Sequence, residues 1–153
     1  MDALTLLKND HEELKKHLKA GENTTERAVK TRAEILDTVS TLLTAHERIE
    51  EEIFYPALKK HPKAKDLVLE GYQEHHVVDV LVDELQDLDE NDERWGAKFK
   101  VLKENIEHHI EEEEGEMFKT ARRVFSEQEL EELGEQMEKM KNETLTASLS
   151  THH

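Results

Sequence analysis

The chain has 153 residues and carries 21 Lys and Arg against 37 Asp and Glu, a formal net charge of −16. This length fits one domain, and the acidic excess excludes the clustered cations that nucleic acids and anionic membranes require. The absence of Cys excludes disulfides, thiolate metal sites and Cys nucleophiles. The N-terminus has no signal region, and no apolar stretch reaches the length of a membrane helix. We therefore expect a soluble, cytoplasmic protein with no nucleic-acid or membrane partner.

Apolar residues recur at spacings of three and four along the chain, which predicts an all-α protein. The first helix runs through Leu4 and Leu18 and ends near Gly21, where a turn spans residues 21–25. The second carries the stripe from residue 35 to 53, the third begins near Pro62, and the fourth follows a break at residues 89–92. Short turns between long amphipathic helices predict an up-down-up-down four-helix bundle over residues 1–125.

A fifth helix is predicted after this bundle, because Ser126 and Glu129 have the spacing of a capping box. It covers residues 126–145 with an apolar stripe through Leu130 and Met137, and residues 146–153 are expected to form a frayed tail. This helix either covers the bundle or mediates a homodimer, and the sequence leaves both open. His152 and His153 end the chain as tail or tag residues. The sequence shows no second domain and no internal repeat.

Four of the ten histidines lie on the apolar stripes, one on each bundle helix. They are His11, His46, His75 and His109. Two of them have a Glu four residues later, which places both side chains on one helix face: Glu50 follows His46, and Glu113 follows His109. An unpaired carboxylate in an apolar core is costly, whereas imidazole and carboxylate together suit a cation. This pattern predicts a metal site inside the bundle.

Register supports this prediction for three helices. Residues at equal depth in an antiparallel hairpin are equidistant from its turn. His46 and His75 are centred on the break near Pro62, and His75 and His109 are centred on the break at residues 91–92. The midpoint in sequence between His11 and His46 lies about five residues beyond the predicted first turn, which corresponds to roughly 7 Å along a helix. The first turn is therefore longer than the sequence indicates, or the second helix extends past the first.

The arrangement resembles the haemerythrin-like, or HHE cation-binding, family over about residues 2–125. The residues that carry the resemblance are the segment NDHEEL from Asn9, the segment HERIEEEIFYP from His46, the triplet EHH from Glu74 and the segment HHIEEEE from His108. The resemblance implies a four-helix bundle holding two non-haem iron ions with a bridging oxygen. It assigns the four stripe histidines as terminal ligands and Glu50 and Glu113 as bridges.

The sequence departs from the oxygen-carrying members on the third helix, where those proteins have a second His four residues after the first. Asp79 stands at that position if His75 is the ligand, and Val80 if His76 is. Asp79 is therefore a candidate metal ligand in a site richer in carboxylate, which favours oxidative turnover over reversible oxygen binding. His76, His108, Glu112 and Glu114 stay as alternatives to their neighbours.

Three functional readings follow. The first is a di-iron protein that binds or reacts with O2, peroxide or nitric oxide, with a di-iron oxidase or peroxide-consuming activity left open. The second is an iron or oxygen sensor, or an iron store, in which metal changes the stability of the bundle and a partner responds. The third is a helical interaction module without metal.

Overall fold

The computed structural model describes residues 1–151, and in this part of the chain it contains helices and no strand. In chain order these are α1 (Ala3–Glu22), α2 (Val29–Ile49), the π-helical turn η1 (Glu50–Phe54), α3 (Tyr55–Lys59), the 3₁₀ turn η2 (Pro62–Ala64), α4 (Lys65–Gln86), α5 (Trp95–Glu112), the π-helical turn η3 (Glu113–Met117), α6 (Phe118–Val124) and α7 (Glu127–Thr151).

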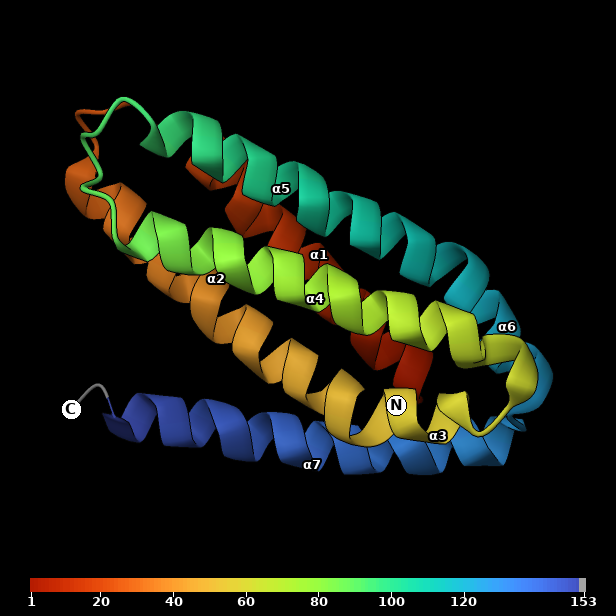
Figure 1. The fold of residues 1–153 in the computed structure, drawn as a ribbon. Coiled ribbons are helices and arrows are strands. Elements are labelled where there is room, and N and C mark those ends of the chain that lie inside the picture. Colours follow the sequence, from red (N-terminus) through yellow and green to blue (C-terminus); the bar gives the residue numbers. More distant parts are fainter. Residues whose placement is uncertain (152–153) are drawn as a thin grey trace.

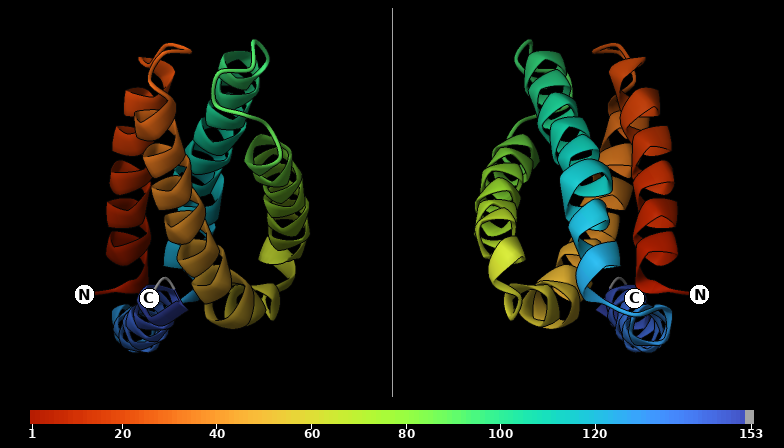
Figure 2. Two further views of the ribbon diagram at one scale, coloured as in Figure 1. Left: turned by 90° about the vertical axis from the view of Figure 1, so that its left-hand side faces the viewer. Right: turned by 90° about the vertical axis from the view of Figure 1, so that its right-hand side faces the viewer.

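The helices α1, α2, α4 and α5 form an up-down-up-down bundle, and α7 lies outside it (Figure 1). The helix α2 continues through η1 into α3, and α5 continues through η3 into α6. Figure 2 shows α7 nearly end-on beneath the four bundle helices. The predicted four-helix bundle with an extra C-terminal helix is therefore confirmed.

The first connection spans Asn23 to Ala28 and is longer than the predicted turn at residues 21–25. Arg32 holds this connection in place. Its guanidinium donates to Thr24 Oγ1 over 2.9 Å and to the Glu90 carbonyl over 2.6 Å, which also ties it to the loop before α5. The longer turn accounts for part of the register offset between His11 and His46.

The apolar core is divided into two clusters. One, which includes Trp95 and Phe99, fills the half of the bundle towards the α1–α2 and α4–α5 connections. The other, which includes Phe54 and Phe118, fills the half that α3, α6 and α7 close. Along every bundle helix, the buried His lies between residues of the two clusters, as His11 does between Leu7 and Leu14. A polar layer therefore crosses the middle of the bundle.

The helix α7 begins with the predicted capping box and packs on α1 and α2. The Glu129 amide donates to Ser126 Oγ over 3.1 Å, and the Ser126 amide donates to Glu129 Oε1 over 2.9 Å. Gly134 lies directly against the backbone of residues 1–3, so a Cβ at this position would clash. Leu130 and Met137 are buried against the chain's own bundle, which shows that α7 covers it.

In the described part of the tail, for which fraying after residue 145 is predicted, α7 continues to Thr151. Contacts with α2 anchor the helix near this point. Arg48 donates to Thr144 Oγ1 over 2.8 Å, and Leu145 lines a groove together with Leu42. His152 and His153 lie outside the described residues.

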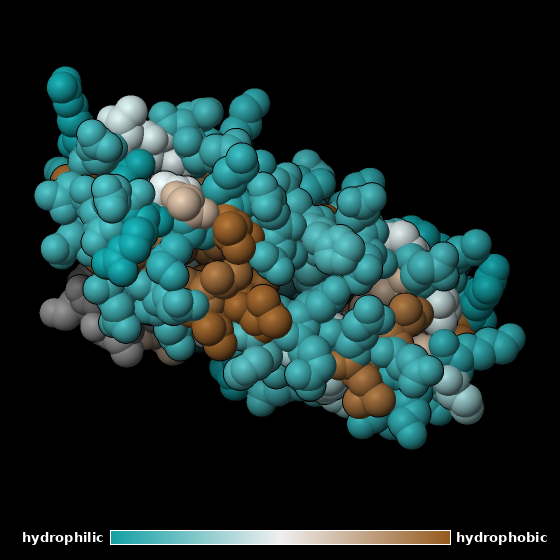
Figure 3. Space-filling view, turned by 45° about the horizontal axis from the view of Figure 1, so that its top comes forward, coloured by the Kyte–Doolittle hydropathy of each residue, from teal (hydrophilic) through white to brown (hydrophobic). Residues whose placement is uncertain are grey.

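The face in Figure 3 is mostly hydrophilic, with a few hydrophobic groups among charged side chains. The exposed large apolar residues of α4 and α5 are Leu69, Val77, Val80 and Val101. None of the helices in residues 1–151 combines the length and hydrophobicity that crossing a membrane would require.

Candidate metal centre

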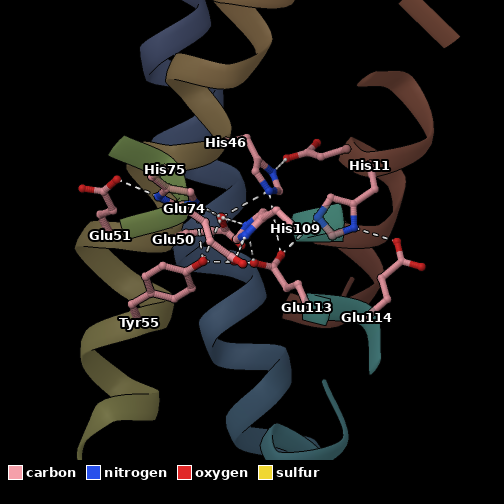
Figure 4. Close-up of polar contacts among 11 residues, drawn as sticks. His11, His46, Glu50, Glu51, Tyr55, Glu74, His75, His109, Glu113 and Glu114 are labelled. Atoms are coloured by element: carbon pink, nitrogen blue, oxygen red, sulfur yellow. Dashed lines mark hydrogen bonds and ion pairs between the residues drawn. The ribbon is translucent and has the colours of Figure 1, made fainter. Parts of the chain in front are cut away.

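Four imidazole rings and two carboxylates meet in the polar layer (Figure 4). The rings come from four different helices, and the carboxylates open the two π-helical turns. All six side chains are at least nine-tenths buried; they are His11, His46, His75, His109, Glu50 and Glu113. The structure thus brings six of the seven predicted site residues together.

Each carboxylate contacts histidines of both helical hairpins. Glu50 Oε1 lies 2.9 Å from His75 Nε2 and 3.3 Å from His46 Nε2. Glu113 Oε1 lies 3.1 Å from His11 Nε2, while its Oε2 lies 3.1 Å from His109 Nε2. Both glutamates therefore sit between the ring pair of α1 and α2 and the ring pair of α4 and α5.

The outward nitrogen of every ring bonds to a further acid. Nδ1 of His11 donates to Glu114 over 2.7 Å, and Nδ1 of His46 donates to Asp10 over 2.9 Å. Nδ1 of His75 donates to Glu51 over 2.7 Å, and Nδ1 of His109 donates to Glu74 over 2.6 Å. An ionised carboxylate can only accept, so the proton of a neutral ring sits on Nδ1. This tautomer turns the Nε2 lone pair into the cluster, which is the arrangement of a metal-ligating His.

Each of these outer acids is the sequence neighbour of one of the six residues that meet in the polar layer, but it bonds to a His on a different helix. Asp10 precedes His11 and bonds His46, and Glu74 precedes His75 and bonds His109. Such crossed pairing follows from helix packing, so spacing within one helix could not reveal it. The available signal was an acid directly beside His11, Glu50, His75 and Glu113 in the sequence.

The crossed pairs expose an internal two-fold relation between the two hairpins, which the sequence alone did not show. The hairpin of α1 and α2 matches the hairpin of α4 and α5 position by position. The equivalent pairs are Asp10 and Glu74, His11 and His75, His46 and His109, Glu50 and Glu113, Glu51 and Glu114. The π-helical turns η1 and η3 start at equivalent residues.

Each π-helical turn also carries an aromatic ring to the cluster, five residues after its Glu. Tyr55 stacks on His75 with ring centroids 5.4 Å apart, and Phe118 stacks on His11 at 6.2 Å. Position i+5 lies well off the i and i+4 face of an α-helix. A π-helix has more residues in each turn, so it aligns position i+5 with the Glu. An α-helical reading of the sequence could therefore not place Tyr55 in the site.

The hydroxyl of Tyr55 makes the two symmetry-related sides of the cluster chemically different. It donates to Glu113 Oε2 over 3.1 Å and lies 3.4 Å from His75 Nε2, whereas the equivalent Phe118 has no hydroxyl. Gly71 makes room for it, because a Cβ there would lie 2.8 Å from the hydroxyl oxygen. Burial and the charges of Glu50 and Glu113 raise the pKa of Tyr55 well above 10, so the hydroxyl stays a donor.

The carboxylates also shift the pKa values of the rings. Burial opposes the charged imidazoles, but Glu113 outweighs it and raises the pKa of His11. Glu50 likewise outweighs burial and raises the pKa of His75 to about 9, and the pKa of His109 rises well above its ordinary value for similar reasons. In the absence of a metal ion, protons on these rings compensate the buried carboxylates.

Asp79 is the predicted site residue that lies outside the cluster. One turn after His75, the residue of α4 that faces the core is Val78, and Asp79 is exposed. Its carboxyl contacts Glu47 at the surface between α2 and α4. Burial and this contact raise the pKa of Glu47 to about 9.

The alternative ligands also lie outside the centre. His76, His108 and Glu112 are exposed, and His108 pairs with Glu112 over 3.1 Å at the surface. Glu114 contacts the outward nitrogen of His11 and not its inward one.

The donor set fits metal ions. Nε2 of His46, Nε2 of His109 and Oε2 of Glu50 are buried and make no hydrogen bond. Buried polar atoms are ordinarily paired, so these atoms call for a partner. Two overlapping groups could each hold a cation, with Glu50 in both: His11, His46, Glu50 and Glu113 form one, and Glu50, His75 and His109 form the other.

Comparison with known families agrees with this geometry. The family model described as "Hemerythrin HHE cation binding domain" matches residues 2–121. The chain belongs to the haemerythrin HHE cation-binding family. A crystal structure of an HHE cation-binding domain-containing protein, the Rv2633c homologue from Mycobacterium kansasii, is 26% identical with a TM-score of 0.87. The similarity covers 98% of this chain and 91% of that one. The search of curated proteins found no match. For this HHE protein, the family and the His and Glu clusters together point to metal binding.

Proposed function

We propose that this HHE protein holds two iron ions in the cluster and uses them to react with O2, peroxide or nitric oxide. The observation that carries the proposal is the convergence of four Nε2 atoms on two carboxylates, with two of those nitrogens and one carboxylate oxygen making no hydrogen bond. Bound iron would supply the redox chemistry.

The histidines would act in pairs, one pair on each ion. His11 and His46 would hold one ion, and His75 and His109 the other, because the centroids of the two rings in each pair are 5.0 Å apart. Glu50 and Glu113 would be shared, since each already contacts rings of both pairs. The outer acids hold each ring in the tautomer that presents Nε2.

The surroundings restrict what reaches the site. A cavity of about 20 Å³ adjoins the four histidines, and its remaining walls are mostly aliphatic, with Leu14, Val78 and Ile106 among them. A space of this size accommodates about one water-sized molecule, which supports small ligands over organic substrates. Tyr55 does not line this cavity; its hydroxyl donates to Glu113 at another edge of the cluster.

Metal content per chain and ultraviolet–visible absorption test the proposal on protein purified without a His-affinity column. About two irons per chain, with absorption that shifts on adding azide, would support a di-iron centre with an accessible position. Consumption of added peroxide would then distinguish turnover from storage. A colourless, folded protein that takes up no iron anaerobically would overturn the proposal.

One contact favours a sensing role as a second candidate. Lys141 of α7 bonds Asp10 over 2.5 Å, and Asp10 in turn holds His46. Occupancy of the centre could therefore change how firmly α7 packs. Increased proteolysis within α7 on removal of iron, without peroxide turnover by the loaded protein, would favour the sensor over the enzyme.

A further inference from the structure

A groove between α2 and α4 leads towards the centre, and most of the charged residues that line it are acidic. It has a volume of about 550 Å³ and includes Glu47, Glu51, Asp79 and Asp83 in its walls. Arg48 also lines the groove, but it pairs with Glu52 over 2.6 Å. Asp79 and Asp83 keep their attraction for a cation.

Glu47 stands between this groove and the inner site. It lines the groove on one side and, on the other, the small cavity against the four histidines. Its side chain is nine-tenths buried, and its Oε2 is buried without a hydrogen-bond partner. Ligand atoms of Glu47, Glu51 and His75 lie within 4.8 Å of one another, which is close enough to share an ion.

The internal two-fold relation makes Glu47 an exception. The equivalent residue of the other hairpin is Ile110, which is also buried, and the equivalent of Asp79 is Lys15. The fold therefore accepts an aliphatic side chain at this position. A buried carboxyl with an unsatisfied oxygen costs stability that isoleucine would not, so packing does not explain the glutamate.

We infer that Glu47, Glu51 and Asp79 form an outer binding site for a divalent cation, through which iron reaches the inner centre. This inference rests on the proposed iron centre and adds its loading route. Figure 4 shows Glu51 on the far side of His75 from the cluster. His75 separates the two sites, since Nδ1 bonds Glu51 while Nε2 lies 2.9 Å from Glu50. The acids of the groove concentrate cations at its mouth, and Glu47 provides the last oxygen before the cavity.

The rate of iron uptake tests the inference. Fe²⁺ is added anaerobically at two ions per chain, and a ferrous chelator measures the iron still free at timed intervals. The variants are Glu47→Ile and Asp79→Lys, which install the residues of the other hairpin. Glu135→Gln, an exposed acid of α7 away from the groove, is the matched control.

The expected result is an initial uptake rate about tenfold lower in both variants, with the final iron content and absorption of the wild type. Raising the ionic strength should slow the wild type more than the variants, because it screens the acids of the groove. Asp79 is exposed, so its replacement leaves the core intact even if Glu47→Ile unfolds the chain.

Uptake at the wild-type rate by the folded variants would overturn the outer site while leaving the iron centre standing. A lower final iron content in Asp79→Lys would also overturn it, because Asp79 would then belong to the inner centre. A wild type that binds no iron would instead refute the proposed function and the loading route together.

Discussion

At the scale of single residues, the two halves of the centre differ most at one hydroxyl. Tyr55 and Phe118 are equivalent in position, and each stacks on a histidine, but only Tyr55 can donate a hydrogen bond. A proton donor beside one ion and an inert ring beside the other would give the two ions different reactivity.

Replacing this hydroxyl separates iron binding from turnover. We expect Tyr55→Phe to retain the wild-type iron content, because the four histidines and two glutamates are untouched. Peroxide consumption should fall on the order of a hundredfold, the effect of losing a positioned proton donor. Tyr72→Phe, which removes a hydroxyl bonded to the Glu51 carbonyl outside the cluster, is the control. Unchanged peroxide kinetics in Tyr55→Phe would show that the hydroxyl has no role in turnover.

The outer acids permit a second prediction at this scale. Glu74→Gln keeps an acceptor for His109 but removes the charge that bonds Nδ1 over 2.6 Å. Iron affinity should fall by about tenfold, the usual effect of weakening a partner of a ligating histidine. Competition with a chelator measures this affinity. Glu111→Gln on the exposed face of α5 serves as the comparison, and equal affinity in both variants would contradict the prediction.

At the scale of elements, α7 is part of the support of the metal centre as well as a cover. Lys141 of α7 donates a hydrogen bond to Asp10, whose carboxylate is only 7% exposed. Burial alone would raise the pKa of Asp10, but its bonds to His46 and Lys141 outweigh burial and lower it. His46 and Lys141 together therefore keep Asp10 charged despite its burial.

Lys141→Met should consequently weaken both the fold and the site. Loss of a charge-assisted bond to a buried carboxylate costs about 1–3 kcal/mol, and iron should dissociate faster because His46 is held less firmly. Urea unfolding and iron release to a chelator provide the two measurements. Lys139→Met, an exposed position on the same helix, should change neither. Equal stability of the two variants would refute the role given to Lys141.

The elements also show what sequence can and cannot predict. The helical period placed one histidine of each bundle helix in the core and paired two of them with glutamates, because an α-helix fixes the i and i+4 face. Asp79 was a candidate because the resemblance puts a ligand four residues after His75, yet on α4 Val78 faces the core instead. The π-helical turns, and the acids that bond across helices, depend on packing that no single-helix period contains.

At the scale of the whole molecule, protons and metal ions compete for the same buried layer. In the folded chain without metal, the pKa of His75 rises to about 9 from 6.5, and that of Glu47 rises to about 9 from 4.5. Both groups then hold protons that the unfolded chain releases. Stability is highest where these protons are bound in the folded state and falls as pH increases towards 9.

Opposite pH trends are therefore expected for the two forms of the protein. Without metal, the free energy of unfolding should fall between about pH 6.5 and 9, by on the order of 1 kcal/mol per pH unit for each titrating group. The iron-loaded protein should gain stability over the same range, because its ligands must be deprotonated. Thermal unfolding of both forms at several pH values measures this, and parallel trends would contradict it.

The two π-helical turns also decide where the length of the chain can vary. Inserting one residue into η1 or η3 would turn everything beyond it by about 100°, whereas removing one would restore a regular α-helix with Tyr55 or Phe118 at position i+4 on the face of its Glu. After an insertion, Tyr55 or Phe118 would leave its histidine, and the apolar face of α3 or α6 would turn out of the core. The connections at 23–28 and 87–94 bear no such constraint, because they lie at the end of the bundle away from the π-helical turns. Insertions should therefore be tolerated in those two loops and excluded from residues 50–55 and 113–118.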